Sequence, residues 1–412
     1  MNQSDLWVDA LLIKFIIISM AKEVLLIGTS FSAVPIYSAL KQLGCRVAVC
    51  GASPADPCHV FADESHHIDY SQRELLLELV RDKGIKHIVP SCNDYAYLSA
   101  AWVAEQESLD GFDSYETTLI LHNKNAFRKF ADRKGYPIPK AISVHGLDQF
   151  GEPNLAVPML VKPVDSFSGR GMTKVHDQDE LKSAIARAIS NSRSGEALIE
   201  DFIDGTLHSH SVLFQDGRFV FEVVADEYCT VYPYQVNCSN VPSSLPKVLR
   251  RKVSECIQQL VIDLNLADGM LHTQFMVRGK DFWLIECMRR SPGDLYYKMV
   301  ELSTGINGMD LYVRPFAGFK MPESITPKAS RFIARHTIST AAPIVATSFS
   351  IDLPTSSLQI VPLKNSGEIL EKAPYDKLAI FFLELRSENE LFRTAPNLAN
   401  YVSIQKPEGI DQ

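Results

Sequence analysis

The sequence has few features of a disulfide-bonded, zinc-binding or nucleic-acid-binding protein. Its eight cysteines are scattered over 412 residues, and no two have the C-x-x-C spacing of zinc or redox sites. Acidic residues outnumber basic ones by 49 to 41 and no basic patch stands out, so a nucleic-acid partner is not expected. We therefore expect mostly buried, reduced thiols in a cytoplasmic protein.

Long apolar runs are also scarce. The strongest one, residues 6–20, is interrupted by Asp9 and Lys14 and is short for a membrane span. It lacks the basic start and the small-residue cleavage site of a secretory signal. We expect residues 1–20 to be an extension, with Met20 as an alternative start, and no membrane partner. A membrane anchor is the competing interpretation.

Glycine is missing where a dinucleotide site would need it. Residues 21–118 alternate short apolar runs with helical stretches, which predicts a parallel sheet with helices on its faces. The first turn reads Gly28-Thr-Ser-Phe-Ser-Ala and holds one glycine where the dinucleotide fingerprint has three. The second strand ends at Cys50-Gly51, without an acidic residue for a ribose. This front domain is expected to have the dinucleotide fold without that function.

The rest of the chain predicts a mixed central domain at residues 119–320 and a smaller β-rich domain at residues 321–412. Asn123 is placed to cap a helix, and Gly135 would end that helix. A later pair of apolar strands is expected to turn at residues 278–281. The expected fold class is therefore α/β and α+β: a parallel-sheet front domain, a central domain and a small β-rich C-terminal cap.

Three features of the central domain are typical of nucleotide binding. Lys124 and Lys162 each lie at the edge of a predicted element and would offer a compact positive charge to phosphate oxygens. In the loop Ser166-Phe-Ser168-Gly169-Arg-Gly171, glycines let backbone N–H groups point at a phosphate. Glu200 and Ile203 end a strand where a flat base could dock. Each feature alone has a simpler interpretation, because such lysines are commonly solvated and such loops are commonly only loops.

A fourth feature is an acidic residue within an apolar hairpin. Glu286 lies in Phe282-Trp-Leu-Ile-Glu-Cys-Met, and Gln274 is expected to face it from the preceding strand. A buried carboxylate is costly unless it is paired or bound to a metal, and magnesium bridging phosphates takes one or two carboxylates. Glu286 is therefore predicted to be a metal ligand rather than a stray core acid. Arg289 and Arg290 follow, and two guanidinium groups suit a carboxylate or a phosphate.

Taken in order, these motifs resemble those of the ATP-grasp superfamily over about residues 20–320. The order is Lys124, Lys162-Pro163, the Ser/Gly loop, Glu200-Asp-Phe-Ile203, and Glu286-x-x-x-Arg290-x-x-Gly293-Asp294. The chain is most similar to the biotin carboxylase and carbamoyl phosphate synthetase type, which also has a dinucleotide-fold front domain and a small β cap. The resemblance implies a two-lobed domain that binds ATP together with Mg²⁺ or Mn²⁺.

The resemblance also implies a role for each residue of these motifs. Gln274 and Glu286 would bind the metal, and Arg290 would stabilise the phosphoryl group or the substrate carboxylate. The residues expected to bind ATP are Lys124, Lys162, Ser168, Gly169, Gly171, Glu200, Ile203 and His208.

Two positions depart from the family pattern. Asparagine usually follows the metal glutamate by two residues, and here Met288 offers a thioether, which is a poor ligand for magnesium. A glutamate for the ribose is often found near position 207, and here that residue is Leu207. Metal number or nucleotide affinity is therefore expected to differ from the family norm.

The resemblance implies an ATP-dependent carboxylate–amine ligase that acts through an acyl phosphate on a small carboxylate. Its expected partners are a small carboxylate, an amine and a second copy of the chain through the front domain. One alternative is a bicarbonate-using enzyme of the carboxylase or carbamoyl-phosphate type. The other is a nucleotide-binding protein without catalysis, which Met288 and Leu207 would favour.

A few polar segments have no assigned role. Residues 227–238 combine aromatic and amide groups and either line a pocket or form a packed loop. Residues 91–95 end a front-domain strand and are either a ligand-binding or a solvated turn. His210 and His272 are candidates for proton transfer, with a structural role as the alternative.

Overall fold

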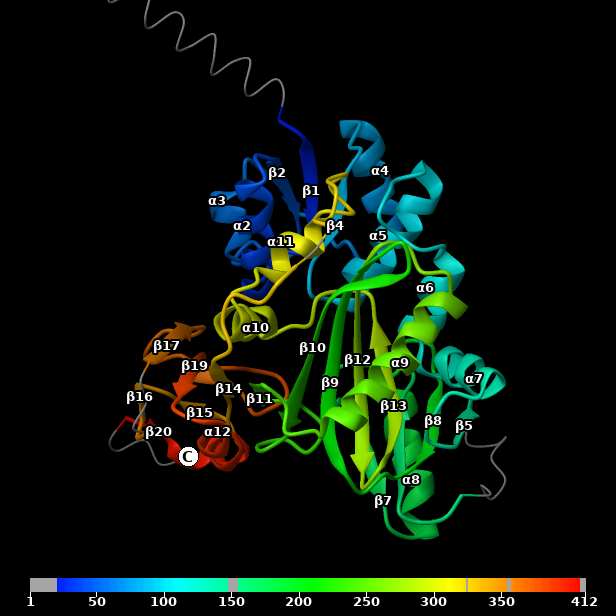
Figure 1. Ribbon diagram of the computed structural model, residues 1–412, viewed down its shortest axis with the longest axis vertical. Helices are drawn as coiled ribbons and strands as arrows, with labels where there is room; N and C mark the ends of the chain where they lie inside the picture. Colours follow the sequence, from blue (N-terminus) through cyan, green and yellow to red (C-terminus); the bar gives the residue numbers. More distant parts are fainter. Residues whose placement is uncertain (1–20, 147–154, 324, 354–356, 408–412) are drawn as a thin grey trace, which may run out of the picture. The chain divides into compact units, whose positions relative to one another are not determined.

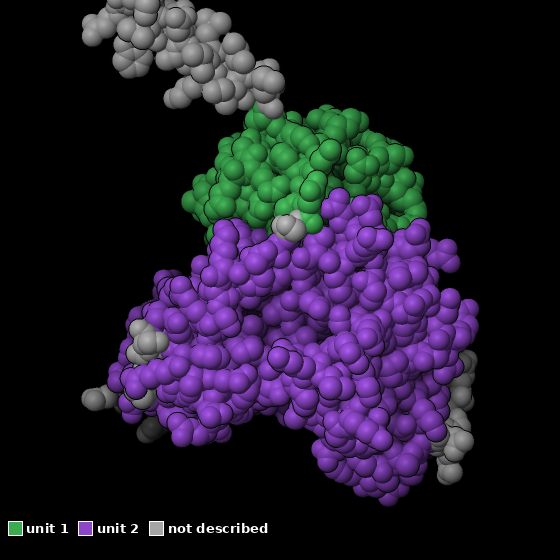
Figure 2. Space-filling view, viewed as in Figure 1, with its two compact units in different colours: residues 1–115, 267–269, 308–323 green, residues 116–266, 270–307, 324–412 purple. Residues whose placement is uncertain are grey.

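The computed structural model describes residues 21–146, 155–323, 325–353 and 357–407 (Figure 1). The described residues form two compact units, coloured separately in Figure 2. Unit 1 holds the described residues up to 115 together with 267–269 and 308–323, and unit 2 holds the others. The predicted extension at residues 1–20 lies outside the described part. The predicted domain boundaries at residues 118 and 320 remain predictions.

Unit 1 is built on a four-stranded parallel sheet in the order β3-β2-β1-β4. The strands are β1 (Glu23–Ile27), β2 (Arg46–Cys50), β3 (Glu64–His66) and β4 (Ile88–Pro90). Its helices are η1 (Phe31–Ala33), α2 (Val34–Gln42), α3 (Cys58–Phe61), α4 (Arg73–Lys83), α5 (Asp94–Glu107) and α11 (Gly308–Val313). Four consecutive residues of β1, from Val24 to Ile27, are fully buried, which is typical of a parallel strand covered on both faces. The predicted parallel sheet is confirmed.

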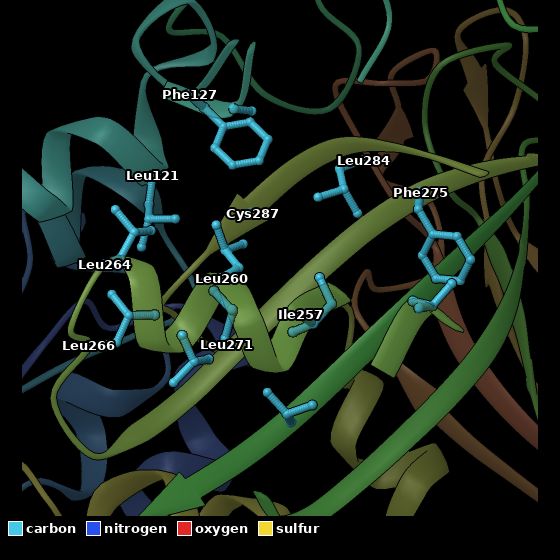
Figure 3. Close-up of a cluster of buried hydrophobic side chains, with 14 of the residues drawn as sticks. Leu121, Phe127, Ile257, Leu260, Leu264, Leu266, Leu271, Phe275, Leu284 and Cys287 are labelled. Atoms are coloured by element: carbon cyan, nitrogen blue, oxygen red, sulfur yellow. The ribbon is translucent and has the colours of Figure 1, made fainter. Parts of the chain in front are cut away.

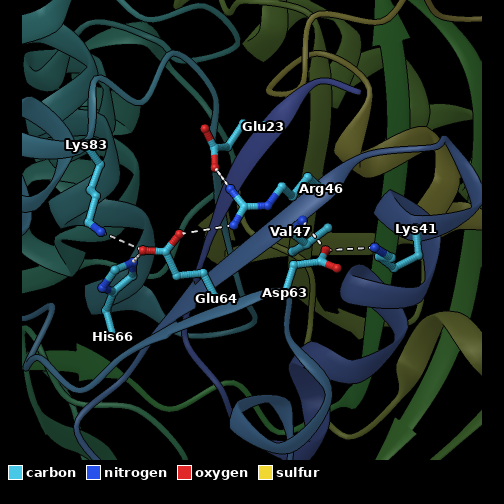
Figure 4. A network of polar contacts seen from close by, with 8 residues as sticks. All are labelled: Glu23, Lys41, Arg46, Val47, Asp63, Glu64, His66 and Lys83. Carbon is cyan, nitrogen blue, oxygen red and sulfur yellow. Dashed lines mark hydrogen bonds and ion pairs between the residues drawn. The ribbon is translucent and has the colours of Figure 1, made fainter. Parts of the chain in front are cut away.

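Ion pairs at the surface join neighbouring strands of this sheet (Figure 4). Arg46 of β2 pairs with Glu23 of β1 at 2.5 Å and with Glu64 of β3 at 3.4 Å. Lys83 at the end of α4 also reaches Glu64, at 2.6 Å. The side chain of Arg46 is 43% exposed, so each of its pairs contributes only about 0.2–1 kcal/mol. Apolar burial, rather than these charges, holds the front sheet together.

Unit 2 contains a small four-stranded sheet in the order β5-β8-β6-β7. Its strands are β5 (Ala141–Val144), β6 (Met159–Pro163), β7 (Thr173–Val175) and β8 (Ala197–Asp201). The helix α8 (Gln178–Ser190) is capped by Asp177, whose side chain accepts from two backbone N–H groups of the first turn. Its apolar face, including Leu181 and Ile185, packs against Val161 and Ile199 of the sheet.

The larger sheet of unit 2 has eight strands in the order β13-β12-β9-β10-β11-β14-β19-β17. They are β9 (Thr206–Gln215), β10 (Arg218–Tyr228), β11 (Cys238–Val241), β12 (Gly269–Arg278), β13 (Asp281–Met288), β14 (Phe332–Ile338), β17 (Ser357–Pro362) and β19 (Ala379–Leu385). The C-terminal part is rich in strands, as expected. Three of those strands extend this sheet, because β14 pairs with β11.

The remaining elements of unit 2 surround these two sheets. They are α6 (Tyr115–His122), α7 (Lys124–Lys134), α9 (Lys247–Asp263), α10 (Tyr296–Thr304), α12 (Glu388–Thr394), η3 (Ala395–Tyr401) and the short strands β15 (Ile344–Val345), β16 (Ser348–Ile351), β18 (Ile369–Leu370) and β20 (Val402–Gln405). No helix in the described ranges combines the length and apolarity needed to cross a bilayer.

The larger sheet has one apolar face and one polar face. On the apolar face, Ile257 and Leu260 of α9 pack against strand residues such as Leu271 and Phe275 of β12 (Figure 3). Alternate residues of a strand point to opposite faces, so the intervening residues of β9 and β12 face the other way. These include Ser209, Ser211, His272 and Gln274. This polar face carries the candidate site.

Candidate functional site

The start of α7 brings two basic residues onto one helix face. Asn123 caps the helix, since its side chain accepts from the N–H of Ala126 at 2.9 Å, as predicted. The first turn places Lys124 and Arg128 four residues apart, so their side chains point the same way. Lys124 was predicted from the sequence and Arg128 was not, although its i,i+4 spacing from Lys124 is a usable signal.

Lys124 joins three segments that are far apart in the sequence. Its ammonium lies 3.0 Å from a carboxylate oxygen of Glu286 and donates to the carbonyl of Ser166 at 2.7 Å. The helix-start lysine, the Ser/Gly loop and the predicted metal ligand therefore meet at one point in unit 2.

Lys162, Arg128 and Glu200 form a buried ionic group beside this point. Glu200 accepts from Nε of Arg128 and from the ammonium of Lys162, each at 2.6 Å. The three residues are only 1–3% exposed. Burial alone would raise the pKa of Glu200, but the charges of Arg128 and Lys162 outweigh burial and hold that pKa below its usual range. Burial lowers the pKa of Lys162 to about 8, despite the opposing effect of Glu200.

The ionic group has more positive than negative charge. Arg128 and Lys162 carry two positive charges, whereas their shared partner Glu200 carries one negative charge. Within the described residues, Nη1 of Arg128 is buried and has no hydrogen-bond partner. Buried donors and unbalanced buried charges are costly, so both observations fit the binding of an anion here.

The Ser/Gly loop has a backbone in the left-handed region that favours glycine. Ser168, Gly169 and Gly171 have φ angles of 56°, 70° and 72°, in the left-handed region. A Cβ at Gly169 would lie 2.5 Å from the Cβ of Tyr234, and the Tyr232 hydroxyl donates to the Gly169 carbonyl at 3.0 Å. Residues 232–234, left open as pocket or packed loop, thus pack against the Ser/Gly loop.

The predicted metal pair lies on the polar face of the larger sheet. Gln274 and Glu286 are direct partners across β12 and β13, and the hairpin turns between Arg278 and Asp281 as expected. The Glu286 side chain is 30% exposed, so the expectation that it is a buried acid was wrong. The register shifts between Gln274 and Phe275, whereas Cys287 and Met288 at the end of β13 are buried, so Glu286 is more exposed than the residues that follow it. Met288 lies opposite His272.

These residues fit a magnesium ion that is held mainly by phosphates. An amide oxygen and a carboxylate are hard oxygen donors, and magnesium bound to a nucleotide needs only one or two protein carboxylates. Over the described ranges there is no group of three or more His, Cys, Asp or Glu side chains that could hold a metal unaided. Gln274 and Glu286 would therefore hold the ion together with phosphate oxygens.

The structure changes the interpretation of His208. The ring is 2% exposed, and its two nitrogens contact Thr206 at 2.7 Å and Asp226 at 2.9 Å. It stacks on Phe275, which faces α9, so strand alternation places His208 on the face opposite Gln274. The predicted contact of His208 with the nucleotide is therefore not supported by the geometry.

The adenine-binding residues remain a prediction. Both carboxylate oxygens of Glu200 are engaged by Arg128 and Lys162, so this side chain acts first as their counter-ion. Ile203 lies just beyond the end of β8, where its backbone is outside the regular sheet.

The two consecutive arginines after β13 have different environments. Arg289 is 1% exposed, lies with its guanidinium 5.0 Å from the Phe214 ring centre and donates to the Met270 carbonyl. These contacts make it a structural residue. Arg290 is half-buried and donates to the Ser291 carbonyl at 3.2 Å.

His210 and His272 also have structural environments. Burial, followed by the charges of Arg290, His210 and Arg335, lowers the pKa of His272 to about 3. A ring with so low a pKa is neutral near pH 7 and is a poor proton donor. Its Nδ1 lies 2.6 Å from the Ser211 hydroxyl, and His210 contacts Glu222 at 2.9 Å.

Several polar residues of the site escaped the sequence analysis because they come from distant strands. Arg335 of β14 is 2% exposed and donates to the Asp294 carbonyl at 3.0 Å and to the Ser239 hydroxyl at 2.9 Å. Asp294 also forms an ion pair with Lys377. Burial would raise the pKa of Asp294, but Lys377 and Arg335 hold that pKa below its usual value. No local sequence signal places residues 335 and 377 beside residue 294.

Comparison with known proteins agrees with this geometry. The ATP-grasp domain family matches residues 155–296. The chain carries an ATP-grasp domain. A formate-dependent phosphoribosylglycinamide formyltransferase from Prochlorococcus marinus is 24% identical over 333 residues, or 76% of this chain and 80% of that protein.

Solved structures share the ATP-grasp fold over nearly the whole chain. An L-amino acid ligase from Bacillus licheniformis is 18% identical, with a TM-score of 0.80, and the match covers 94% of this chain and 99% of that one. A biotin carboxylase complex from Campylobacter jejuni is 15% identical, with a TM-score of 0.72, covering 93% and 92% of the two chains. The predicted superfamily and fold class are confirmed, and the individual site residues remain predictions.

Proposed function

We propose that the protein is an ATP-dependent carboxylate–amine ligase that works through an acyl-phosphate intermediate. The observation that carries this proposal is the position of Lys124, whose ammonium contacts both Glu286 and the Ser166 carbonyl. One charge thus links the predicted metal ligand to the predicted phosphate loop. The ATP-grasp domain match and the ligase-like fold support the same conclusion.

The basic residues would hold the triphosphate. Lys124, Lys162 and Arg128 supply the positive charge, while Glu200 fixes two of these side chains in place. When bound to Gln274 and Glu286, magnesium would supply further charge neutralisation on the transferred phosphoryl group. The left-handed backbone of the Ser/Gly loop would direct its N–H groups to the phosphates and exclude water. The reaction then needs positioning more than acid–base catalysis.

A second basic group near the end of β13 would hold the carboxylate to be activated. Arg290 begins the Arg290–Asp294 segment, and Arg335 and Lys377 approach this segment from two other parts of unit 2. Guanidinium groups bind carboxylates with two parallel hydrogen bonds, which would hold the acceptor oxygen for phosphoryl transfer. An amine would then attack the acyl phosphate, form the C–N bond and release phosphate.

The substrates proposed are a small carboxylic acid and an amine. One relative is named for its dependence on formate and one structural neighbour for ligation of L-amino acids, so both kinds of acid belong in a screen.

A homodimer remains a prediction. A reducing, cytoplasmic setting is also proposed, because the eight cysteines are all free thiols.

The test is ADP release with Mg-ATP across pools of small acids, amino acids and amines. We expect release only with an acid present, and hydroxylamine in place of the amine should trap the acyl phosphate as a hydroxamate. The Lys162→Met variant is the inactive control. Binding of Mg-ATP without turnover in any pool would contradict the ligase proposal. Turnover with bicarbonate alone would favour a carboxylase-type reaction instead.

A further inference from the structure

The predicted metal ligand Gln274 is held by an acidic residue from another strand. Its amide nitrogen Nε2 donates to Oε2 of Glu227 at 2.6 Å. Glu227 belongs to β10 and is only 5% exposed. Burial raises the pKa of Glu227 above its usual value, and the Ser209 hydroxyl and the charge of Arg335 act in the opposite direction and favour its carboxylate. Glu227 is therefore a fixed group in a polar network, and Gln274 is the member of that network nearest the predicted metal position.

The contact decides which end of the Gln274 amide is available to a cation. A glutamine side chain has a donor end and an acceptor end, and only the oxygen can bind a metal ion. A carboxylate accepts hydrogen bonds, so Glu227 holds the Nε2 end. Oε1 is then the end left for a ligand, and the cross-strand partner of Gln274 is Glu286.

We propose that Glu227 is a positioning residue that fixes the Gln274 amide with its oxygen toward the bound divalent cation. The cation site belongs to the proposed function, and to that extent this inference rests on it. Glu227 acts through Gln274 and does not itself bind the metal. Outer contacts of this kind commonly change metal affinity by about 10–100-fold.

The same contact explains why position 274 carries an amide instead of a carboxylate. A carboxylate there would lie at hydrogen-bond distance from Glu227, and with both groups ionised neither would have a proton to donate. Two like charges at that distance repel strongly, and the burial of Glu227 would strengthen the repulsion. Glutamine at 274 and glutamate at 227 are therefore a matched pair. The negative charge lies on Glu227, which does not bind the metal, and the neutral amide lies on Gln274, which would bind it.

A double-mutant cycle tests the matched pair. The four proteins are the wild type, Gln274→Glu, Glu227→Gln and the double variant, all as full-length chains. The binding of Mn²⁺ in the presence of ADP is measured from the loss of the free Mn²⁺ signal in electron paramagnetic resonance. This readout does not depend on turnover.

The Glu227→Gln variant should bind Mn²⁺ about 10–100-fold more weakly than the wild type. The Gln274→Glu variant should also bind it more weakly than the wild type. In Gln274→Glu the new carboxylate is repelled by Glu227, and in Glu227→Gln the amide at 274 loses its fixed orientation. The double variant should recover wild-type affinity or exceed it. The amide introduced at position 227 can donate a hydrogen bond to the carboxylate at 274, and that carboxylate also attracts the cation by its negative charge. A change in Mn²⁺ affinity from Gln274→Glu that is the same with and without the Glu227→Gln substitution would overturn the inference.

A surface pair offers a matched control. Gln259 of α9 donates its Nε2 to Asp263 at 2.8 Å, in an exposed setting. Gln259→Glu therefore makes the same chemical change in water and should leave Mn²⁺ affinity unchanged.

The cycle also separates this inference from the proposed function. The same four proteins are unfolded with urea in the absence of metal and nucleotide. We expect Gln274→Glu to lower the urea midpoint when it is made in the wild type. The same substitution made in the Glu227→Gln variant should lower the midpoint less. Absence of Mn²⁺–ADP binding by the wild type would contradict the proposed function, whereas an additive stability cycle would contradict the pairing of Glu227 with Gln274.

Discussion

At the scale of single residues, charge balance is the property that defines the site. The buried Glu200 carboxylate is shared by two cations, and it stays ionised because both of them approach it within hydrogen-bond distance. The lysine predicted to contact phosphate, Lys162, is therefore not a solvated side chain, which was its simpler interpretation. Its environment determines both its proton affinity and its availability to a nucleotide.

The first prediction concerns the pH dependence of nucleotide binding through Lys162. Its pKa in the folded protein is about 8, against an ordinary value of 10.5. The side chain should lose its charge as the pH rises through about 8, so affinity for Mg-ATP should fall between about pH 7 and pH 9.5. Titration calorimetry across that range measures it. Lys162→Met should bind weakly at every pH and show little dependence.

The sign of the linked stability change is opposite. Between about pH 8 and 10.5 the unfolded lysine holds more proton than the folded one, so this residue's contribution to stability should increase with pH. Comparing the pH dependence of unfolding for the wild type and Lys162→Met isolates that contribution. Nucleotide affinity that stays constant across this range would show that the charge on Lys162 does not hold phosphate.

The second prediction concerns Arg128, which the sequence analysis missed. Arg128→Met removes one of the two cations that pair with the buried Glu200 and should reduce the free energy of unfolding by about 3–5 kcal/mol. It should also weaken Mg-ATP binding, because the unpartnered Nη1 is lost. Chemical denaturation and calorimetry measure the two effects.

Arg133 is the matched control on the same helix. It is exposed and donates to the Lys129 carbonyl at 3.3 Å, so Arg133→Met should change stability by less than about 0.5 kcal/mol. Equal effects of the two substitutions would show that the buried ionic group contributes nothing beyond surface charge.

At the scale of elements, α9 fixes the sheet on which the site is built. Its apolar residues recur at helical spacing, as Leu249, Val253, Ile257 and Leu260, and all of them belong to the buried cluster of which Figure 3 gives a close-up. This packing leaves the other face of the sheet for polar residues. The site therefore depends on α9 even though α9 packs on the opposite face of the sheet.

The third prediction tests this element. Leu260 is fully buried in the cluster, whereas Ile262, two residues along the same helix, is 56% exposed. Leu260→Ala should lower the free energy of unfolding by about 2–5 kcal/mol through lost burial and a residual cavity. Ile262→Ala should change it by less than about 0.5 kcal/mol. Urea denaturation of the two variants gives the comparison, and similar midpoints would argue against this packing.

At the scale of the whole molecule, residues from distant segments should be coupled by the ligand. Lys124, Lys162 and Glu286 come from a helix and two different sheets of unit 2 and meet in one place. A ligand that contacts all of them binds only the folded state. Its binding must therefore stabilise the fold.

The fourth prediction is a rise in the thermal unfolding midpoint with Mg-ATP. At a free concentration about one hundred times the dissociation constant, binding should add about 2.7 kcal/mol to the free energy of unfolding. A thermal shift assay measures the change, and magnesium or ATP alone should give a smaller one. The Lys162→Met variant should show little shift at the same concentrations. An equal shift in that variant would place the nucleotide elsewhere.

Local patterns in the sequence specified most of the elements. The cap at Asn123, the helix end at Gly135, the strand that ends at Cys50 and the turn between Arg278 and Asp281 all appear where residue types and periodicity predicted them. The reason is that capping, alternation and turn formation depend on neighbours within a few residues.

The tertiary structure decided what those patterns left open. Strand register placed His208 on the opposite face from Gln274, and packing between distant segments left Glu286 partly exposed and brought Glu227 and Arg335 to the site. These outcomes depend on contacts between residues that are distant in the chain, and no local spacing encodes them. The sequence by itself determined the elements, the superfamily resemblance and the principal candidate ligands. Packing determined which charges lie together, because only the folded chain brings remote strands within hydrogen-bond distance.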